Sequence, residues 1–242
     1  MKEQERVFEV QITDDGSATI FIPEMDEHYH SVKGALTESL HIYRDCAFMH
    51  RSDGTRLQLL EVGFGTGLNA TVTAMIADSD HPVHYITLEK YPVSEDVLST
   101  LHYDEIVDKM LFDAIHHAQW DTPVEITPYF TIEKRRCDYT CDELPNGIDV
   151  VYFDAFAPEK QPNMWTAEAF SRLFDSLNPG AVLTTYCAKG EIRRLLTATG
   201  FTVERLAGPV GGKREILRAT KKITTHDTIA HSSHFHTHNF AL

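Results

Sequence analysis

The sequence has few cysteines, no long apolar run and few basic residues. Four cysteines among 242 residues do not make a disulfide framework, and Cys137 and Cys141 have no partner pair with zinc-site spacing. No stretch approaches the roughly 20 apolar residues that cross a bilayer. The first ten residues, MKEQERVFEV, lack the apolar core of a secretion signal. We therefore expect reduced thiols, no metal, no membrane partner and a cytoplasmic location.

Basic side chains are scarce mainly in the first half of the chain. The formal net charge is −14, which argues against simple electrostatic capture of nucleic acid. Residues 1–132 hold 8 basic and 23 acidic side chains, whereas residues 133–222 hold 14 and 12. Any polyanionic partner is therefore expected to bind the second half.

Strand and helix patterns alternate through the middle of the chain, which predicts an α/β fold with a doubly wound, mostly parallel sheet. Strands are expected at residues 57–62, 84–89, 129–136, 148–155 and 181–186. Helices are expected at residues 68–77, 92–118, 166–177 and 191–199. Two last strands, 201–206 and 215–220, have no helix between them and should form a final antiparallel pair.

The beginning and end of the chain differ from this pattern. Residues 7–23 predict a β-hairpin around Asp14-Asp15-Gly16, and a helix should open near Ser31 or Lys33. We expect one domain over residues 1–222, with residues 1–50 as an N-terminal hairpin and helix extension. Residues 223–242 are polar, carry five histidines and are expected to form a flexible tail, with metal binding as the alternative.

The stretch LLEVGFGTGLNA places three glycines directly after an expected strand. Glycine costs conformational entropy, so the backbone must turn tightly or a ligand must approach it. Such a turn presents backbone N–H groups and a helix N-terminus to the ligand. The dinucleotide fingerprint G-x-G-x-x-G needs a glycine where this chain has Leu68, which leaves an NAD(P)-dependent oxidoreductase only as an alternative.

Three acids at strand ends favour a different cofactor. Glu61 suits an amino-acid ammonium group, Glu89 suits ribose hydroxyls, and Asp138 suits an adenine amino group. Together they match S-adenosylmethionine, which has these three parts and no phosphate; ordinary strand-end charges are the alternative. The expected cofactor-binding residues are Glu61, Gly63, Phe64, Gly65, Gly67, Asn69, Glu89, Lys90, Asp138 and Asp154.

A second motif, DAFAPEKQPNMW, follows the fourth strand, at the sheet edge where such folds bind ligands. Its acid, aromatic and proline resemble the D/N-P-P-Y-type loops of amine and amide methyltransferases. There the polar side chain, here Asp154, accepts a hydrogen bond from the nitrogen to be methylated. Phe156, Pro158 and Trp165 would exclude water; a proline-stiffened loop around core Phe156 and Trp165 is the alternative.

Several motifs, in order, resemble the methyltransferase domain of MnmC, a tRNA wobble-uridine modification family. They are EVGFGTGLNA, LEKYP, DAFAPEKQPNMW, TYCAKGEIRRLL and GFTVERLAGP with GGKREILRA. The resemblance covers residues 7–221 and implies a class I, Rossmann-like methyltransferase fold. It also implies methylation of 5-aminomethyl-(2-thio)uridine to the 5-methylaminomethyl nucleoside.

The chain has no room for the flavin oxidase domain of the bifunctional enzyme, so it resembles the stand-alone form, and no FAD is expected. tRNA is the expected partner, and an upstream tRNA-modifying enzyme is a candidate second one. A small-molecule amine N-methyltransferase and a non-catalytic binding module are the remaining alternatives.

Roles in such a reaction follow from residue type. Asp154 is the expected catalytic residue, as a positioner of the amine and a proton acceptor. Tyr29 and Tyr186 are candidates for stacking on the base. Candidate phosphate contacts are Lys160, Lys189, Arg193, Lys213 and Arg214.

Overall fold

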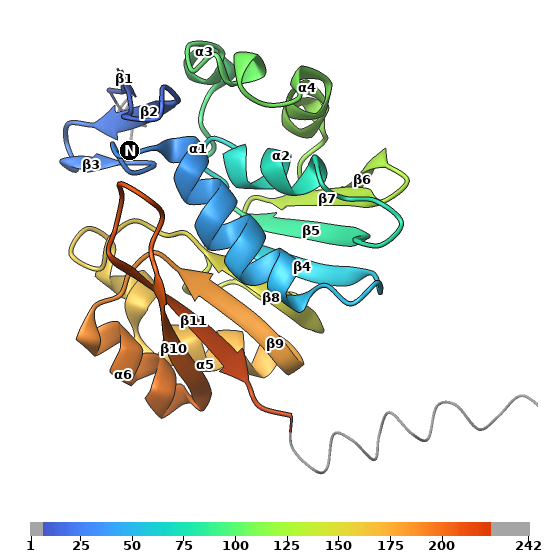
Figure 1. Cartoon of the computed structure of the whole chain (residues 1–242), viewed down its shortest axis with the longest axis vertical. Coiled ribbons are helices and arrows are strands. Elements are labelled where there is room, and N and C mark those ends of the chain that lie inside the picture. The colour runs from blue at the N-terminus through green and yellow to red at the C-terminus, as the bar shows by residue number, and fades with distance from the viewer. Residues whose placement is uncertain (1–6, 224–242) are drawn as a thin grey trace, which may run out of the picture.

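The computed structural model describes residues 7–223, whose main feature is an eight-stranded sheet with the order β10-β11-β9-β8-β4-β5-β7-β6 (Figure 1). The parallel strands are β4 (Leu57–Val62), β5 (Val83–Leu88), β7 (Phe130–Arg135), β8 (Ile148–Phe153) and β9 (Leu177–Thr185). The chain runs from β4 outward through β5 to β7, and returns through β8 to β9 on the other side. The predicted doubly wound sheet is confirmed. The order in which the chain adds strands changes direction between β4 and β8, and such sheets bind ligands at this position.

The remaining strands of this sheet are antiparallel to their neighbours. They are β6 (Pro123–Thr127), β10 (Phe201–Ala207) and β11 (Glu215–Lys221). The final antiparallel pair is therefore confirmed, and it continues the sheet beyond β9.

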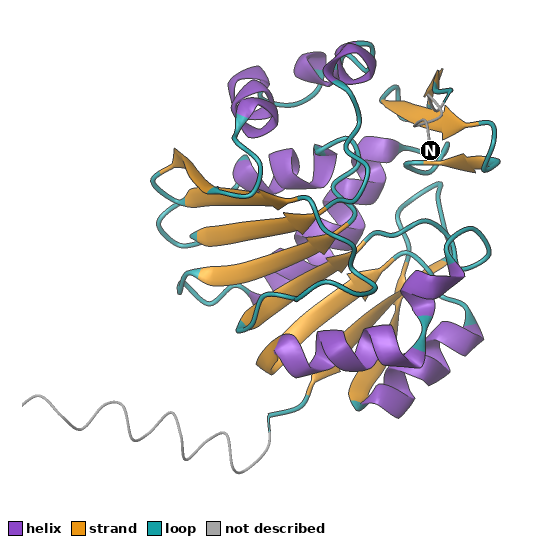
Figure 2. Cartoon of the chain, turned by 180° about the vertical axis from the view of Figure 1, so that it is seen from behind, coloured by secondary structure: helices purple, strands orange, loops and turns teal. Residues whose placement is uncertain are grey.

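Helices cover both faces of the sheet (Figures 1 and 2). On one face, η1 (Ser39–Met49), α2 (Leu68–Ala74) and α4 (Lys109–His117) contribute Ile42, Ala70 and Ile115 to a buried core. On the other face, α5 (Ala167–Ser176) and α6 (Gly190–Thr199) contribute Phe170 and Ile192 to a second core. The continuous apolar runs of β4 and β8 are thus buried on both sides, as parallel strands require.

The N-terminal hairpin is confirmed and belongs to a small separate sheet of β1 (Glu9–Ile12), β2 (Ala18–Ile22) and β3 (Glu27–His28). Ala18 and Ile20 pack against Leu68 of α2. The Asp15 carboxylate accepts hydrogen bonds from Ser17 and, at 2.9 Å, from the backbone N–H of Thr37. These bonds hold its pKa below the usual range and tie the hairpin to α1 (Ala35–Glu38).

The expected elements differ from the structure at three places. The helix expected over 92–118 is three short helices, α3 (Glu95–Ser99), η2 (Tyr103–Glu105) and α4, because the backbone of His102 adopts a left-handed conformation. Strand β6 was missed, since it lies at the sheet edge and its hydrogen bonds come from β7. Strand β9 begins at Leu177 rather than 181, because Leu177 already pairs with Ile148 of β8.

The helix expected to open near Ser31 or Lys33 begins at Ala35, and most of it is the π-helix η1, with the wider turns that often occur at functional sites. No helix within residues 7–223 is long and apolar enough to cross a membrane. The expected single domain stays a prediction, and the expected tail at 223–242 lies outside the described residues, save Ile223.

Candidate active site

Glycine is required where the loop after β4 meets the loop after β8. Gly63 has φ +95°, and a Cβ there would lie 2.8 Å from the backbone oxygen of Asp154. The backbone N–H of Asp154 in turn donates to the carbonyl of Val62 at 3.1 Å. A Cβ on Gly65 would lie 3.0 Å from the ring of Tyr29 in the N-terminal extension. The bare backbone thus lets three segments, far apart in sequence, meet around one pocket.

This pocket, called the inner pocket, lies at the carboxyl ends of β4, β5, β7 and β8. Seven of the ten predicted cofactor residues line it: Gly63, Phe64, Gly65, Glu89, Lys90, Asp138 and Asp154. Tyr29, His30, Phe156 and Met164 complete much of the wall.

The two acids predicted to bind the ribose hydroxyls and the adenine amino group are held in place by hydrogen bonds. Glu89 accepts the backbone N–H groups of Gly65 at 3.2 Å and Tyr91 at 2.7 Å. Asp138 accepts a hydrogen bond from Lys90 at 2.6 Å and others from Thr140, which lower its pKa to about 2. Both carboxylates are therefore oriented at the mouth of the inner pocket.

The other three predicted cofactor residues lie behind the pocket wall. Glu61 is fully buried and accepts a hydrogen bond from Thr87 at 2.8 Å, and burial raises its pKa to about 8. Its side chain does not line the inner pocket, and its predicted contact with an ammonium group stays a prediction. Gly67 is the N-cap of α2, and Asn69 binds Asp154 instead of facing the pocket.

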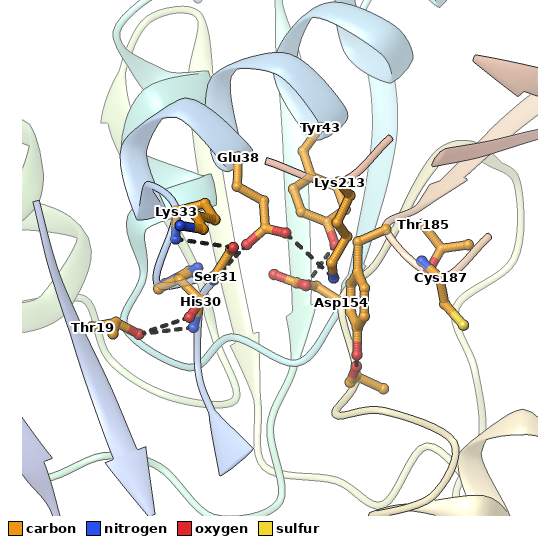
Figure 3. Close-up of polar contacts among 12 residues, drawn as sticks. Thr19, His30, Ser31, Lys33, Glu38, Tyr43, Asp154, Thr185, Cys187 and Lys213 are labelled. Atoms are coloured by element: carbon orange, nitrogen blue, oxygen red, sulfur yellow. Dashed lines mark hydrogen bonds and ion pairs between the residues drawn. The ribbon is translucent and has the colours of Figure 1, made fainter. Parts of the chain in front are cut away.

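Asp154 is at the centre of the site (Figure 3). Its Oδ1 accepts a hydrogen bond from the Tyr43 hydroxyl at 2.5 Å, and its Oδ2 accepts one from Asn69 Nδ2 at 2.8 Å. Burial raises the pKa of Asp154 to about 7, and the Glu38 carboxylate adds to the rise, while the two hydrogen bonds oppose it. Asp154 therefore exchanges a proton near neutral pH.

A second pocket, called the amine pocket, adjoins the inner pocket at Asp154, Tyr29 and Phe156, which line both. Its other wall includes Glu38, Tyr186 and Lys213. The Tyr186 hydroxyl donates to the carbonyl of Ala155 at 2.8 Å, which fixes the ring beside the Asp154 loop.

An outer groove continues from the amine pocket, with which it shares Tyr186 and Lys213. Its lining also contains the predicted substrate residues Pro158, Lys189 and Arg214. The inner pocket, the amine pocket and the outer groove thus follow one another. The predicted cofactor- and substrate-binding residues that line them come from distant parts of the sequence.

Three predicted substrate residues do not line any of these spaces: Lys160, Trp165 and Arg193. Trp165, from η3 (Pro162–Trp165), is buried against Phe153, and its Nε1 donates to the carbonyl of Phe156 at 2.8 Å. This packing supports the loop after β8, and the predicted contact of Trp165 with a substrate stays a prediction. Lys160 is 3.7 Å from Asp26 in an ion pair.

Residues 132–222 match the family described as S-adenosyl-L-methionine-dependent methyltransferase. The bifunctional MnmC protein of Pseudomonas fluorescens, named for tRNA 5-methylaminomethyl-2-thiouridine biosynthesis, is 32% identical over 213 residues. That alignment covers 80% of this chain and 32% of the relative. The chain belongs to the MnmC-type, S-adenosyl-L-methionine-dependent methyltransferases.

Solved structures support the same fold for this methyltransferase. MNMC2 from Aquifex aeolicus has a TM-score of 0.72 at 22% identity, over 94% of this chain and 76% of that one. Spermidine synthase from Thermotoga maritima has a TM-score of 0.59 at 14% identity, over 94% and 74%. The methyltransferase described here spans about a third of the length of the curated relatives that it matches.

Sequence reasoning missed three polar residues of this methyltransferase's site. Nothing local in the sequence marks Tyr43 as polar in role, and only its partner, 111 residues away, reveals it. Glu38 is buried on α1, and His30 donates to or accepts from the Thr66 hydroxyl at 2.7 Å while lining both pockets. Burial lowers the pKa of His30, which favours the neutral ring. The one available signal in the sequence was Glu38, an acid at the start of an apolar helix.

The residues of the inner pocket fit S-adenosylmethionine. Glu89 and Asp138 offer carboxylates at the ends of neighbouring strands, and the Gly63–Gly65 turn leaves a bare backbone between them and Asp154. Within residues 7–223, no group of three or more histidine, cysteine or acidic side chains is placed to hold a metal ion.

Proposed function

We propose that this methyltransferase methylates the primary amine of 5-aminomethyl-(2-thio)uridine at the wobble position of tRNA, giving the 5-methylaminomethyl nucleoside. The observation that carries the proposal is the position of Asp154. It lines both the inner pocket and the amine pocket, and the amine pocket opens into a groove with Lys189, Lys213 and Arg214. A methyl donor, an amine and a phosphate backbone would need binding groups in this order.

The inner-pocket residues Gly63, Gly65, Glu89 and Asp138 would hold S-adenosylmethionine, which supplies a methyl group on a positively charged sulfur. The amine must be neutral to use its lone pair. If its pKa resembles that of lysine, near 10.4, deprotonation at pH 7 costs about 5 kcal/mol. Asp154, whose pKa is about 7, is suited to align the amine and to accept its proton. Alignment of two bound groups contributes on the order of 7–11 kcal/mol.

Three basic residues, Lys189, Lys213 and Arg214, line the outer groove and would give an acidic chain a place to bind tRNA. Each such cation is one candidate phosphate contact, and binding should weaken as salt rises. The acidic first half makes this affinity modest, so we also propose that an upstream tRNA-modifying enzyme delivers the substrate. Such a substrate places the reaction in the cytoplasm.

The test is incubation of the purified protein with methyl-labelled S-adenosylmethionine and tRNA that carries the aminomethyl nucleoside, followed by nucleoside mass analysis. We expect label on the wobble nucleoside and none with the Asp154→Ala variant, which should retain cofactor binding. A near wild-type rate for Asp154→Ala would refute the role of Asp154. Label on free amines but never on tRNA would favour a small-molecule N-methyltransferase.

A further inference from the structure

The amine pocket already contains a primary ammonium group, that of Lys213. Its Nζ lies 3.5 Å from the centroid of the Tyr186 ring and 3.7 Å from Oε1 of Glu38 (Figure 3). It also lies close enough to Asp154 to act on that carboxylate electrostatically. A carboxylate on one side and an aromatic face on the other form the arrangement that proteins use to bind ammonium groups.

Glu38 needs a cation in this pocket. Its side chain is 7% exposed, and its Oε2 accepts the backbone N–H of Ser31 at 2.8 Å. The other oxygen, Oε1, faces Lys213. A buried carboxylate without a counter-charge is costly, so the pocket favours an occupant with a positive charge.

The charge of the pocket wall is strongly one-sided. Among its lining residues, Glu27, Glu38 and Asp154 carry carboxylates, and Lys213 carries the ammonium group. Without the lysine ammonium, the wall presents three acids and the face of Tyr186. Such a wall is complementary to a small cation and not to a neutral base or a phosphate.

The position of Lys213 would allow its side chain to leave the amine pocket. Lys213 is part of the hairpin connection between β10 and β11, which includes the almost fully exposed Val210 and Gly211 with φ +78°. The Lys213 side chain itself is 38% exposed and lines the outer groove as well as the amine pocket. The flexible lysine side chain therefore borders both the carboxylates and the groove where phosphates are expected.

We propose that Glu38 and Tyr186 form the subsite that recognises the substrate's primary ammonium group, and that Lys213 occupies this subsite in the free protein. This inference rests on the proposed function, since it names the recognition groups of the same site. When an amine substrate enters, it replaces the Lys213 ammonium, and Lys213 moves to the phosphate backbone. The lysine therefore opposes small amines that bring no phosphate and favours amines carried on a polyanion.

The decisive experiment measures binding of benzylammonium, an aromatic primary ammonium ion, to the full chain by ligand-observed NMR, with benzyl alcohol as the neutral control. We expect Lys213→Met to bind benzylammonium about tenfold more tightly than wild type, because the competing cation is gone. Lys213→Arg keeps a cation and should show no gain. The double variant with Glu38→Gln and Lys213→Met should not show this gain in benzylammonium affinity. Benzyl alcohol should bind all the variants equally.

Equal benzylammonium affinity in wild type and Lys213→Met, or an undiminished gain in the double variant, would overturn the inference. Thermal melting checks that each variant is folded. Turnover gives a second readout: with Lys213→Met, the KM for the free aminomethyl nucleoside should fall while the KM for tRNA rises. A lysine that only contacts phosphate would leave the nucleoside KM unchanged, which would also overturn the inference. If wild type methylates no tRNA, the proposed function fails, but the benzylammonium series still decides the subsite.

Discussion

Replacing Asp154 with asparagine should abolish methyl transfer and, above neutral pH, make the protein more stable. The carboxylate is buried between Tyr43 and Asn69, so ionising it in the folded state is costly. Asparagine has nearly the same shape and keeps an oxygen for the Tyr43 hydroxyl. Asn69 Oδ1 is buried without a hydrogen-bond partner, and turning the Asn69 amide would offer that oxygen to the new NH2 group.

The size of the effect follows from the pKa of Asp154, which rises from 3.8 to about 7 on folding. Between these two values the folded state holds a proton that the unfolded state has lost, so stability falls as pH rises. At about 1.4 kcal/mol per pH unit, the full loss is about 4 kcal/mol, and roughly 3 kcal/mol of it occurs between pH 5 and pH 8. The Asp154→Asn variant does not undergo this loss.

The assay is urea unfolding of wild type and Asp154→Asn at intervals from pH 5 to pH 8. The difference in unfolding free energy should grow with pH in favour of the variant and level off above about pH 7. Asp138→Asn is the matched control, because the pKa of Asp138 is lowered to about 2 and both states are ionised throughout this range. The difference in unfolding free energy between Asp138→Asn and wild type should not change with pH. A flat Asp154→Asn difference would show that Asp154 is not desolvated as described.

Further predictions concern the groups around Asp154 and the cofactor loops. Tyr43→Phe removes a charge-assisted hydrogen bond, so the pKa of Asp154 should rise, kcat/KM at pH 7 should fall roughly tenfold, and the rising limb of the pH–rate profile should move to higher pH; an unmoved limb would contradict this. Gly63→Ala should lower Tm and cofactor affinity more than Gly54→Ala, which also has a positive φ but no atom within 4 Å of its Cβ; equal losses would refute the close-approach argument. Glu89→Gln should weaken S-adenosylmethionine binding in calorimetry about tenfold, and unchanged affinity would remove Glu89 from the cofactor site.

The local pattern of the chain predicted most of the sheet. The apolar run of β4 and the glycines after it were predicted residue by residue, because strand periodicity and turn chemistry are local properties. The start of α5 was predicted to within one residue for the same reason, and the Thr166 side chain accepts from the backbone N–H of Ala169. Strand β6 escaped prediction since an edge strand of five residues depends on its neighbour for pairing.

The candidate site was predicted in part. Strand-end residues such as Glu89, Asp138 and Asp154 were predicted to line one pocket, because parallel strands end at the same edge. Glu61 was expected beside them, but it precedes the last residue of β4, is fully buried and does not line the inner pocket. Sequence position alone does not reveal which face of a doubly covered strand reaches the ligand.

The sequence by itself determined the order of strands and helices, the glycine turn and the family of this methyltransferase. Only the tertiary structure decided that Tyr43 would meet Asp154, and that Glu38 and Lys213 would meet in one pocket. Periodicity encodes the conformation and the buried face of each segment, which are local. Which polar atoms meet across more than a hundred residues depends on how η1 packs on the sheet and on where the β10–β11 hairpin ends, and these are fixed by the whole core at once.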